Sequence, residues 1–363
     1  MNFLYIIFSF LLFFSTTNWD TFRGNHQHTG FITTKENLPT LEKALWKYKT
    51  NGDVYSSPVI IDSKVYFGSN DCNFYCITAD EGRLVWKKEL GNLIMSSPIY
   101  YKGKIIVGCD DGCLYQLNYK TGEVISKFQS NGRIRSASVI YKDNIIFTSR
   151  DNHCYSITLD SSKLIWSYKT RNEVYSTPTL YKNIILFGSS DSTFYAINAD
   201  NGKELWRFKT NGQIHSIATA KDNLVYFGSN DNYAYCLNIK SGKPLWKYKT
   251  GGFLSTGFSI DDENLYFSAI DGKLYSIDYR TGKEKYIVKF SDSSSIWSSA
   301  LIVNNTIYSI SNSTFYSILY SIDKKTGKII SEMELGGRTY NSPVFYESKL
   351  FLGTKDDFIY CIK

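Results

Sequence analysis

Two columns of side chains that could bind a ligand recur through this sequence, one member about every 40 residues. One column reads Tyr55, Met95, Arg135, Tyr175, His215, Ser255, Trp297 and Tyr340. The other, two positions earlier, reads Asp53, Leu93, Arg133, Glu173, Gln213, Phe253, Ser295 and Arg338. Guanidinium groups beside aromatic rings suit a sugar, a quinone or an anionic peptide terminus. We therefore predict a polar and aromatic binding site formed by Arg133, Arg135, Tyr175, His215, Trp297 and Tyr340.

No combination of residues in the sequence is typical of catalysis or of a metal centre. The Ser and Asp residues lie mostly in predicted turns, so no Ser-His-Asp or Cys-His combination can be singled out. His26 and His28 could ligate a metal, but no third ligand accompanies them. We predict no catalytic residue, no metal site and no cofactor.

The seven cysteines divide into expected core residues and one candidate disulfide. Cys76, Cys236 and Cys361 follow a repeated tyrosine in predicted strands, and we expect them to be small buried residues. Cys109 and Cys113 flank an Asp-Asp-Gly turn. These two cysteines could meet across a hairpin as a disulfide if the chain is exported.

A repeat of about 40 residues sets the elements that must position these side chains. Tyrosines recur at positions 75, 115, 155, 195, 235, 275, 320 and 360, and tryptophans at 46, 86, 166, 206 and 246. Within each repeat, β-branched and aromatic runs are separated by Asn, Asp and Gly turns, which is typical of four antiparallel strands. Eight such units predict an all-β, eight-bladed β-propeller of four-stranded antiparallel blades. A β-solenoid is the rival fold.

The last repeat lacks its fourth strand, and a strand of that type stands before the first repeat. Residues 45–50 carry the fourth-strand pattern, while Lys363 directly follows the eighth third strand. We predict that the N-terminal strand completes the C-terminal blade and closes the ring, which removes two exposed edges. The two ligand columns then lie at the start of the innermost strands, at the mouth of an axial funnel. The alternative for these columns is that they vary because they pack against little.

The N-terminus has the pattern of an export signal. Residues 3–14 are almost continuously apolar, a length that suits the core of a signal peptide better than a membrane span. We predict a signal peptide at 1–17, a leader segment at 18–40 and the propeller at 41–363, with no transmembrane segment. The formal charge of +7 is spread along the repeats, so we expect no nucleic-acid binding.

Residues 199–206, Ala-Asp-Asn-Gly-Lys-Glu-Leu-Trp, resemble the tryptophan-docking repeat of pyrroloquinoline-quinone (PQQ)-type β-propellers, and residues 79–86 are a looser copy. Residues 19–24, Trp-Asp-Thr-Phe-Arg-Gly, are similar to the leader of many exported members of this class. The resemblance implies that tryptophans dock each blade on its neighbour. The docking residues would be Trp46, Trp86, Trp166, Trp206 and Trp246.

Two branches of that family imply different functions. Quinone-dependent dehydrogenases carry large insertions and often an adjacent Cys-Cys pair, whereas this sequence is short by their standard and has no such pair. The non-enzymatic branch includes the BamB-like subunit of the bacterial outer-membrane protein assembly machinery. We therefore expect an exported, monomeric, periplasmic or extracellular scaffold that binds protein partners in the cell envelope. The alternatives are an oxidoreductase that uses PQQ and Ca²⁺, and a carbohydrate- or peptide-binding module.

Overall fold

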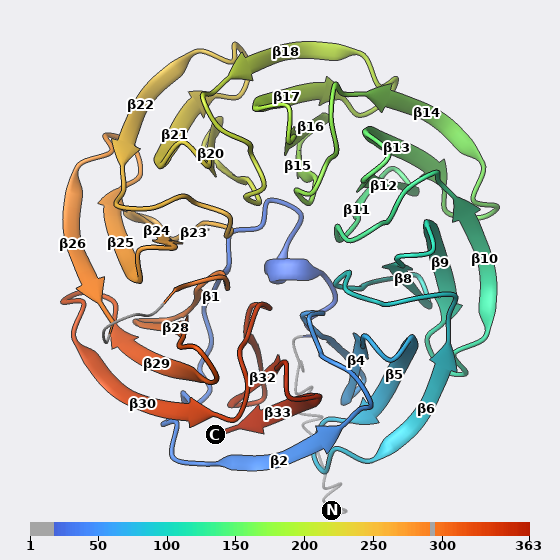
Figure 1. Cartoon of the computed structure of the whole chain (residues 1–363), viewed down its shortest axis with the longest axis vertical. Coiled ribbons are helices and arrows are strands. Elements are labelled where there is room, and N and C mark those ends of the chain that lie inside the picture. The colour runs from blue at the N-terminus through green and yellow to red at the C-terminus, as the bar shows by residue number, and fades with distance from the viewer. Residues whose placement is uncertain (1–17, 291–294) are drawn as a thin grey trace, which may run out of the picture.

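The computed structural model describes residues 18–290 and 295–363, which form a ring of eight antiparallel sheets around a central axis (Figure 1). Each sheet has four strands, apart from one that gains a fifth strand of two residues. Helical structure in these ranges is confined to the 3-10 turn η1 (Phe22–Gly24), and no helix there is long and apolar enough to span a membrane. The predicted all-β, eight-bladed propeller is confirmed. The predicted signal peptide at 1–17 lies outside the described residues.

The blades follow chain order, and the strands of each blade run from the axis outward. Blades 1 to 4 contain β3 (Val59–Ile61), β4 (Lys64–Gly68), β5 (Asn73–Thr78), β6 (Leu84–Glu89); β7 (Ile99–Tyr101), β8 (Lys104–Gly108), β9 (Cys113–Asn118), β10 (Val124–Gln129); β11 (Val139–Tyr141), β12 (Asn144–Ser149), β13 (His153–Thr158), β14 (Leu164–Lys169); and β15 (Thr179–Tyr181), β16 (Ile184–Gly188), β17 (Thr193–Asn198), β18 (Glu204–Lys209). Blades 5 to 7 contain β19 (Thr219–Lys221), β20 (Leu224–Gly228), β21 (Tyr233–Asn238), β22 (Pro244–Lys249); β23 (Ser259–Ile260), β24 (Asn264–Ala269), β25 (Lys273–Asp278), β26 (Glu284–Lys289); and β27 (Leu301–Val303), β28 (Thr306–Asn312), β29 (Ser317–Asp323), β30 (Ile329–Leu335). Blade 8 contains β31 (Val344–Tyr346), β32 (Lys349–Gly353) and β33 (Phe358–Ile362), followed outward by β2 (Ala44–Lys49).

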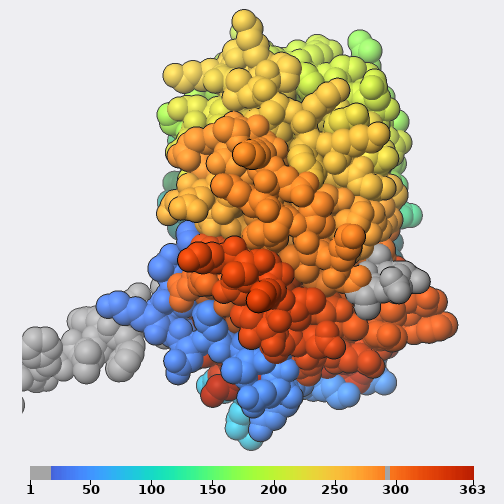
Figure 2. Space-filling model, turned by 90° about the vertical axis from the view of Figure 1, so that its left-hand side faces the viewer, coloured from blue at the N-terminus to red at the C-terminus, as the bar shows by residue number. Residues whose placement is uncertain are grey.

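Blade 8 is completed by the N-terminal strand, as the sequence predicts. β2 pairs antiparallel with β33, with Lys47 opposite Tyr360. In Figure 1 the blue β2 lies outside the red β33, and Figure 2 shows blue N-terminal residues packed against red C-terminal residues. Blades 8 and 1 also meet closely at their inner ends, where a Cβ on Gly353 would lie 2.4 Å from Cγ1 of Val54. The predicted ring closure is therefore confirmed.

The tryptophan column holds five of the eight blades to the next blade through a glycine turn. Trp46, Trp166, Trp206 and Trp246 donate their indole N–H to the backbone carbonyl 33 residues later, at 2.7–3.1 Å. Each indole also lies over the turn glycine three residues beyond that carbonyl, and these glycines have φ between +66° and +71°. A side chain there would meet the ring and strain the backbone. Trp86 packs in the same way, but its N–H has no hydrogen-bond partner among the described residues.

Residues 19–32, which we call the axial segment, pass through the centre of the ring, where η1 lies (Figure 1). The carbonyls of residues 19, 20, 26, 27, 29 and 30 accept backbone N–H groups from residues 60, 100, 180, 220, 260 and 302, at 2.7–3.1 Å. The segment ends in β1 (Phe31–Ile32), which runs parallel to β27. Six inner strands thus have their free edges covered. Residues 19–32 of the predicted leader are therefore packed against the inner strands of the propeller.

Candidate functional site

The two ligand columns surround one mouth of the ring because they flank a column of buried residues. The residue between them, such as Val54 or Ile134, is at most 2% exposed in all eight blades. Since successive side chains of an extended chain point to opposite sides, the residues before and after this buried position face the axis. All eight members of the column that begins at Tyr55 are half-buried. The six predicted binding residues are therefore spread over blades 3, 4, 5, 7 and 8.

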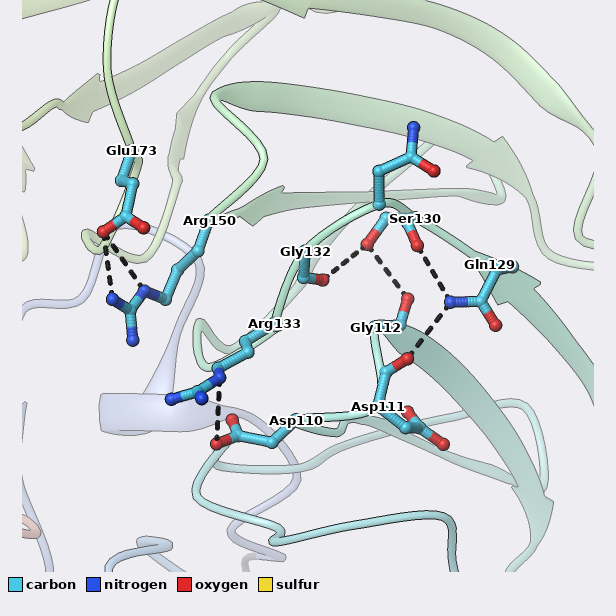
Figure 3. Close-up of a pocket in the computed structure, with 10 residues that line it drawn as sticks. Asp110, Asp111, Gly112, Gln129, Ser130, Gly132, Arg133, Arg150 and Glu173 are labelled. Carbon is cyan, nitrogen blue, oxygen red and sulfur yellow. Dashed lines mark hydrogen bonds and ion pairs between the residues drawn. The ribbon is translucent and has the colours of Figure 1, made fainter.

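On the side of blades 2 to 4, the mouth contains a cavity of about 560 Å³ with a charged wall, which we call the arginine side (Figure 3). Arg135 donates two hydrogen bonds to the Asp110 carboxylate, at 2.8 and 2.5 Å. These bonds raise the pKa of Arg135. Arg133 Nε lies 3.9 Å from the same carboxylate and its side chain is 55% exposed. Arg135 is therefore neutralised in place, whereas Arg133 remains accessible to a ligand.

Arg150 connects this cavity to the predicted residues Tyr175 and His215. It donates to the Glu173 carboxylate at 3.0 and 3.3 Å, and its guanidinium carbon lies 4.4 Å from the ring centre of Tyr175. The rings of Tyr175 and His215 are 4.7 Å apart, and His215 Nε2 lies 2.9 Å from the Ser190 hydroxyl. Burial and the nearby Arg150 lower the pKa of His215, so this ring is neutral near pH 7.

Across blades 6, 7, 8 and 1 the mouth is lined by a continuous arc of aromatic rings, which we call the aromatic side. The arc consists of Phe253, Trp297, Tyr340 and Tyr55, with neighbouring ring centres 5.8, 5.9 and 5.3 Å apart. The guanidinium carbon of Arg338 lies 5.3 Å from the centre of the Tyr340 ring. Lys355 Nζ lies 5.7 Å from the same ring and 5.8 Å from that of Tyr55. Two cations therefore stand against the arc.

One of the two cations of the aromatic side has no ion-pair partner among the described residues. Lys355 Nζ is 3.9 Å from the Asp53 carboxylate. No carboxylate in residues 18–290 and 295–363 forms an ion pair with Arg338, and the buried Nε of Arg338 has no hydrogen-bond partner there. On the arginine side, in contrast, Arg135 and Arg150 each hold a carboxylate directly. The Arg338 guanidinium is therefore available to an anionic ligand, as is that of Arg133 on the arginine side.

Three mouth residues, Asp110, Arg150 and Lys355, were not predicted from the sequence. Each stands immediately before an aspartate of the repeated turn between the second and third strands of its blade. The corresponding residue in blade 1 is Asn70. This position varies from blade to blade in the same manner as the two predicted columns, and that variation beside a constant aspartate is the signal that would have identified it.

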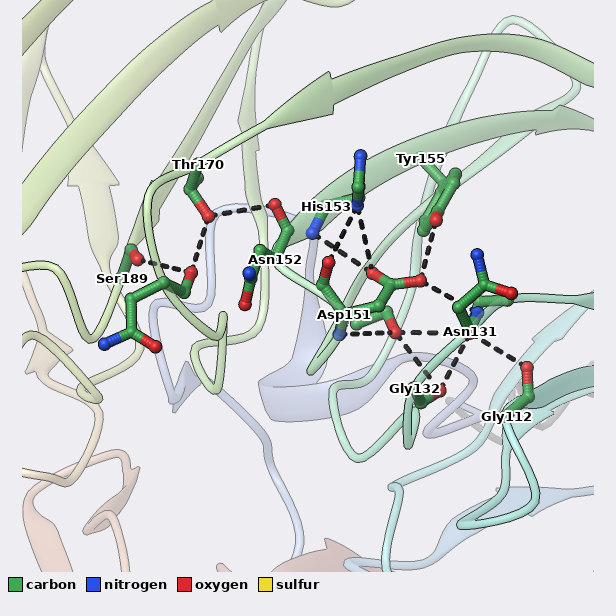
Figure 4. Close-up of polar contacts among 12 residues, drawn as sticks. Gly112, Asn131, Gly132, Asp151, Asn152, His153, Tyr155, Thr170 and Ser189 are labelled. Atoms are coloured by element: carbon green, nitrogen blue, oxygen red, sulfur yellow. Dashed lines mark hydrogen bonds and ion pairs between the residues drawn. The ribbon is translucent and has the colours of Figure 1, made fainter.

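The repeated aspartates themselves are structural, as Asp151 illustrates (Figure 4). Its carboxylate accepts hydrogen bonds from the backbone N–H groups of Asn131 and His153, at 2.9 and 3.2 Å, and from the Tyr155 hydroxyl at 2.7 Å. Six other blades repeat the bond from tyrosine to aspartate. These bonds tie the turn to the third strand, which explains the shared 40-residue spacing of the two residue types.

The candidate disulfide between Cys109 and Cys113 is not formed, because both residues are free thiols. Cys109 Sγ donates to the backbone carbonyl of Asn92 at 3.3 Å, and Cys113 Sγ donates to the side-chain oxygen of Gln129 at 3.0 Å. The hairpin thus directs the two thiols to different neighbours. Burial raises the pKa of Cys109 to about 12, so it remains a neutral core residue.

Residues 18–290 and 295–363 contain no group of three or more His, Cys, Asp or Glu side chains that could hold a metal ion. His26 and His28 belong to the axial segment, and the fully buried His28 places Nδ1 3.2 Å from the Thr179 hydroxyl. Ca²⁺ requires six to eight oxygen ligands. The described residues therefore offer no cluster of carboxylates for the Ca²⁺ ion that the quinone-dependent alternative would use.

Neutral His28 should make the stability of the propeller depend on pH. Burial, with nearby Arg23 and His26, holds the pKa of His28 well below its usual range. The unfolded chain therefore binds this proton more readily, so the stability is fully present above about pH 6.5 and falls at lower pH by up to about 1.4 kcal/mol per unit. Urea unfolding at pH 7.5 and 5.0 should show a larger loss for the wild type than for His28→Asn.

A matched control is Thr179→Val, which removes the hydroxyl beside His28 but keeps the histidine. This variant should lose stability equally at both pH values and retain the pH dependence of the wild type. An equal loss between pH 7.5 and 5.0 in the wild type and His28→Asn would contradict the assignment.

Comparison with known proteins agrees with this fold. Residues 77–363 match the family model described as the beta-propeller of the beta-alanine-activating enzyme. No curated protein matches the chain at a significant level. Among solved structures, BamB from Moraxella catarrhalis is 14% identical, with a TM-score of 0.76, and the match covers 88% of this chain and 98% of BamB.

Two further structures show the same architecture at low identity. The computationally designed Ika8 protein is 17% identical, with a TM-score of 0.75, covering 91% of this chain and 99% of Ika8. A europium-containing methanol dehydrogenase is 11% identical, with a TM-score of 0.76, covering 93% of this chain and 89% of the dehydrogenase. At these identities the likeness is one of fold. Because the family model extends over most of the sequence, the chain belongs to the family of the beta-alanine-activating enzyme β-propeller.

Proposed function

We propose that this chain is a non-catalytic binding module that holds an anionic segment of a partner protein at the mouth of the propeller. The observation that carries the proposal is the aromatic side, where Arg338 lacks an ion-pair partner among the described residues and lies against Tyr340, whose ring in turn neighbours Trp297. Guanidinium groups bind carboxylates in paired geometry, and aromatic rings supply large contact area with few rotatable bonds. A partner segment with a carboxylate beside an apolar side chain fits both features.

The wider charge distribution of the mouth supports an anionic ligand. Among the described residues, five cations surround it, namely Arg133, Arg135, Arg150, Arg338 and Lys355, against four carboxylates, Asp53, Asp110, Asp111 and Glu173. The axial segment occupies the centre of the ring, so the mouth has a protein floor and forms a cup. A cup lined by rings and cations supports surface recognition of a protein segment.

We propose further that this binding serves a scaffolding role in the cell envelope. The apolar run at 3–14 has the length of a signal-peptide core. The fold is shared with BamB from Moraxella catarrhalis, although at 14% identity. Export, envelope location and protein partners are the consequences of this proposal that experiments on the native cell must test.

The decisive test compares affinities of a partner captured from the native envelope. Arg338→Gln combined with Trp297→Ala should weaken binding by about 30-fold or more, the loss that accompanies about 2 kcal/mol at an interface hot spot. The matched control is Phe315→Ala combined with Tyr316→Ala, in the exposed blade-seven loop. Isothermal titration with folded variants should show wild-type affinity for this control.

The opposite pattern would overturn the proposal. Normal affinity in the folded mouth variant, with loss in the Phe315 and Tyr316 variant, would place the interface on blade seven. Absorbance titration with PQQ and Ca²⁺ provides an independent check. A saturable change in the quinone spectrum, together with reduction of a dye, would show that the protein is an oxidoreductase and not a scaffold.

A further inference from the structure

A cavity of about 650 Å³ lies between blades 6 and 7, on the face of the ring opposite the mouth. Its lining comes from β26, from the turn after β23, from two turns of blade 7 and from Phe31 of the axial segment. These turns connect the first strand to the second and the third strand to the fourth, so they lie at the other end of the strands from the two ligand columns. The cavity is thus separate from the mouth, and its volume is in the range of small-molecule sites.

Three charged residues of the lining stand at positions that hold aliphatic or aromatic residues in most other blades. Lys285 is the second residue of β26, where the other seven fourth strands have Leu, Val or Ile. Lys324 follows β29, and the six preceding third strands are followed by Ala, Leu, Ile or Tyr. Asp261 occupies the position that ends the first strand of the other blades, which is tyrosine in four of them and acidic in none. The sequence therefore departs from its repeat at three separate positions that meet at one cavity.

Asp261 and Lys324 form a fixed wall of the cavity. Lys324 Nζ lies 2.9 Å from the Asp261 carboxylate, and both side chains are largely buried. The same carboxylate accepts the backbone N–H groups of Glu263 and Asn264, at 2.9 and 2.8 Å. The Tyr286 hydroxyl donates to the Lys324 carbonyl at 2.6 Å, in the place where other blades use an indole N–H. These contacts compensate both charges and dock blade 6 on blade 7 without a ligand.

Lys285 and Lys325 also line the cavity, and the contact between the blades accounts for neither of them. Both residues are exposed. No carboxylate in residues 18–290 and 295–363 forms an ion pair with either lysine. Asp278 and Asp323 attract them from a longer distance, but these carboxylates accept hydrogen bonds from their own turns. Two ammonium groups are therefore accessible to an anionic ligand.

The rest of the lining suits a sugar ring. Phe31 and Tyr286 are half-buried and contribute aromatic surface, against which the C–H faces of a sugar ring can pack. The amides of Asn264 and Asn305 and the Glu263 carboxylate supply donors and acceptors for hydroxyl groups. A peptide, in contrast, is recognised along a groove or a free strand edge, whereas this lining comes mainly from turns.

The charges of the lining decide which kind of anion fits. Asp261 and Asp262 are each paired with a lysine. Glu263 has no ion-pair partner among the described residues, so this carboxylate and the two free lysines leave one net positive charge. One carboxylate balances that charge, whereas a phosphate group brings nearly two negative charges near pH 7. The lining therefore favours a singly charged ligand.

We propose that this cavity binds a saccharide that carries one carboxylate, a hexuronate unit of an acidic glycan. The carboxylate takes its counter-charge from Lys285 and Lys325, the sugar ring packs on the aromatic lining, and its hydroxyls bond to the amides. The site is independent of the mouth, so the propeller would hold an acidic glycan on one face and its protein partner on the other.

Titration calorimetry of the full chain with sodium D-glucuronate, D-glucose and sodium acetate tests the ligand class. Glucuronate should bind saturably, and the other two probes at least about 10-fold more weakly, because each lacks either the charge or the ring. Equal affinity for acetate would mean a simple anion site, and equal affinity for glucose would mean that the lysines contribute nothing. Either result, or the lack of saturable glucuronate binding, would overturn the proposal. Tighter binding of a tri-aspartate peptide would do the same, since it would show a peptide site.

Variants of the two free lysines test the site itself. Lys285→Leu restores the residue type of the other blades, so this variant should unfold at the wild-type thermal midpoint. Combined with Lys325→Gln, it should weaken glucuronate binding by at least about 10-fold. The matched control is Lys240→Gln, which changes the residue of blade 5 that corresponds to Lys325 and does not line the cavity. This control should bind glucuronate as the wild type does, and unchanged affinity in the folded double variant would contradict the assignment.

The mouth variant, Arg338→Gln with Trp297→Ala, separates this site from the mouth. It should keep the wild-type affinity for glucuronate whether or not it loses the protein partner. Loss of glucuronate binding in this variant would place the sugar at the mouth and would overturn the present proposal alone.

Discussion

Replacing β2 by a Gly-Ser segment of equal length is expected to abolish cooperative unfolding and to yield an aggregating protein. The change removes the fourth strand of blade 8 and exposes the edge of β33. It also removes Trp46, which docks blade 8 on Ala79 of blade 1. The loss should exceed the about 3–5 kcal/mol that truncation of one large core aromatic costs, because an open ring also presents unpaired strand edges. Urea unfolding and light scattering will measure both effects.

The control for this experiment replaces residues 313–316 by Gly-Ser, in a loop where Phe315 is 81% exposed. Its unfolding midpoint should match that of the wild type. A β2 replacement that remained soluble and unfolded at the wild-type midpoint would show that this strand does not close the ring.

Trp206→Ala is expected to destabilise the propeller by about 3–5 kcal/mol. The indole packs over Gly242, lies 6.1 Å from the Phe194 ring between ring centres and donates to the Ile239 carbonyl at 2.7 Å. Truncation would leave a cavity between blades 4 and 5 and an unpaired carbonyl at its edge. Urea unfolding monitored by circular dichroism will give the change in the free energy of unfolding.

Substitution by phenylalanine separates the ring packing from the hydrogen bond. Trp206→Phe keeps an aromatic ring but leaves the Ile239 carbonyl unpaired, so it should cost about 1–3 kcal/mol more than Trp86→Phe. Trp86 is the matched control because its indole N–H has no partner among the described residues. Equal losses in the two variants would show that the hydrogen bond contributes nothing and that packing alone docks the blades.

The fold could be predicted because each blade repeats the same local pattern of strands, turns and hydrogen bonds. The 40-residue spacing of tyrosine and aspartate reflects one hydrogen bond within a turn, as between Tyr155 and Asp151, and such a local contact leaves a visible pattern. Ring closure was also predictable, because one fourth-strand pattern is missing at the C-terminus and one is present at residues 45–50. The positions of the mouth residues could be predicted for a related reason. Their residue types change from blade to blade, whereas the residues next to them in each repeat stay nearly constant.

The contacts of the mouth could not be predicted, because they join residues of different blades. Arg135 donates to the Asp110 carboxylate of the preceding blade, and Arg150 donates to the Glu173 carboxylate of the following blade. The disulfide prediction for Cys109 and Cys113 failed because proximity along a hairpin does not fix the direction of the side chains.

The sequence by itself determined the number of blades, the closing strand and the register of the mouth, because these depend on periodic local patterns and on the pairing of strand edges. Only the tertiary structure decided the course of the axial segment and the burial of Arg23 and Trp19. Residues 19–32 occur once and have no periodicity, so their partners are set by the shape and the free inner edges of six blades. A segment of this kind acquires its conformation from the completed ring, and the sequence carries no local signal of it.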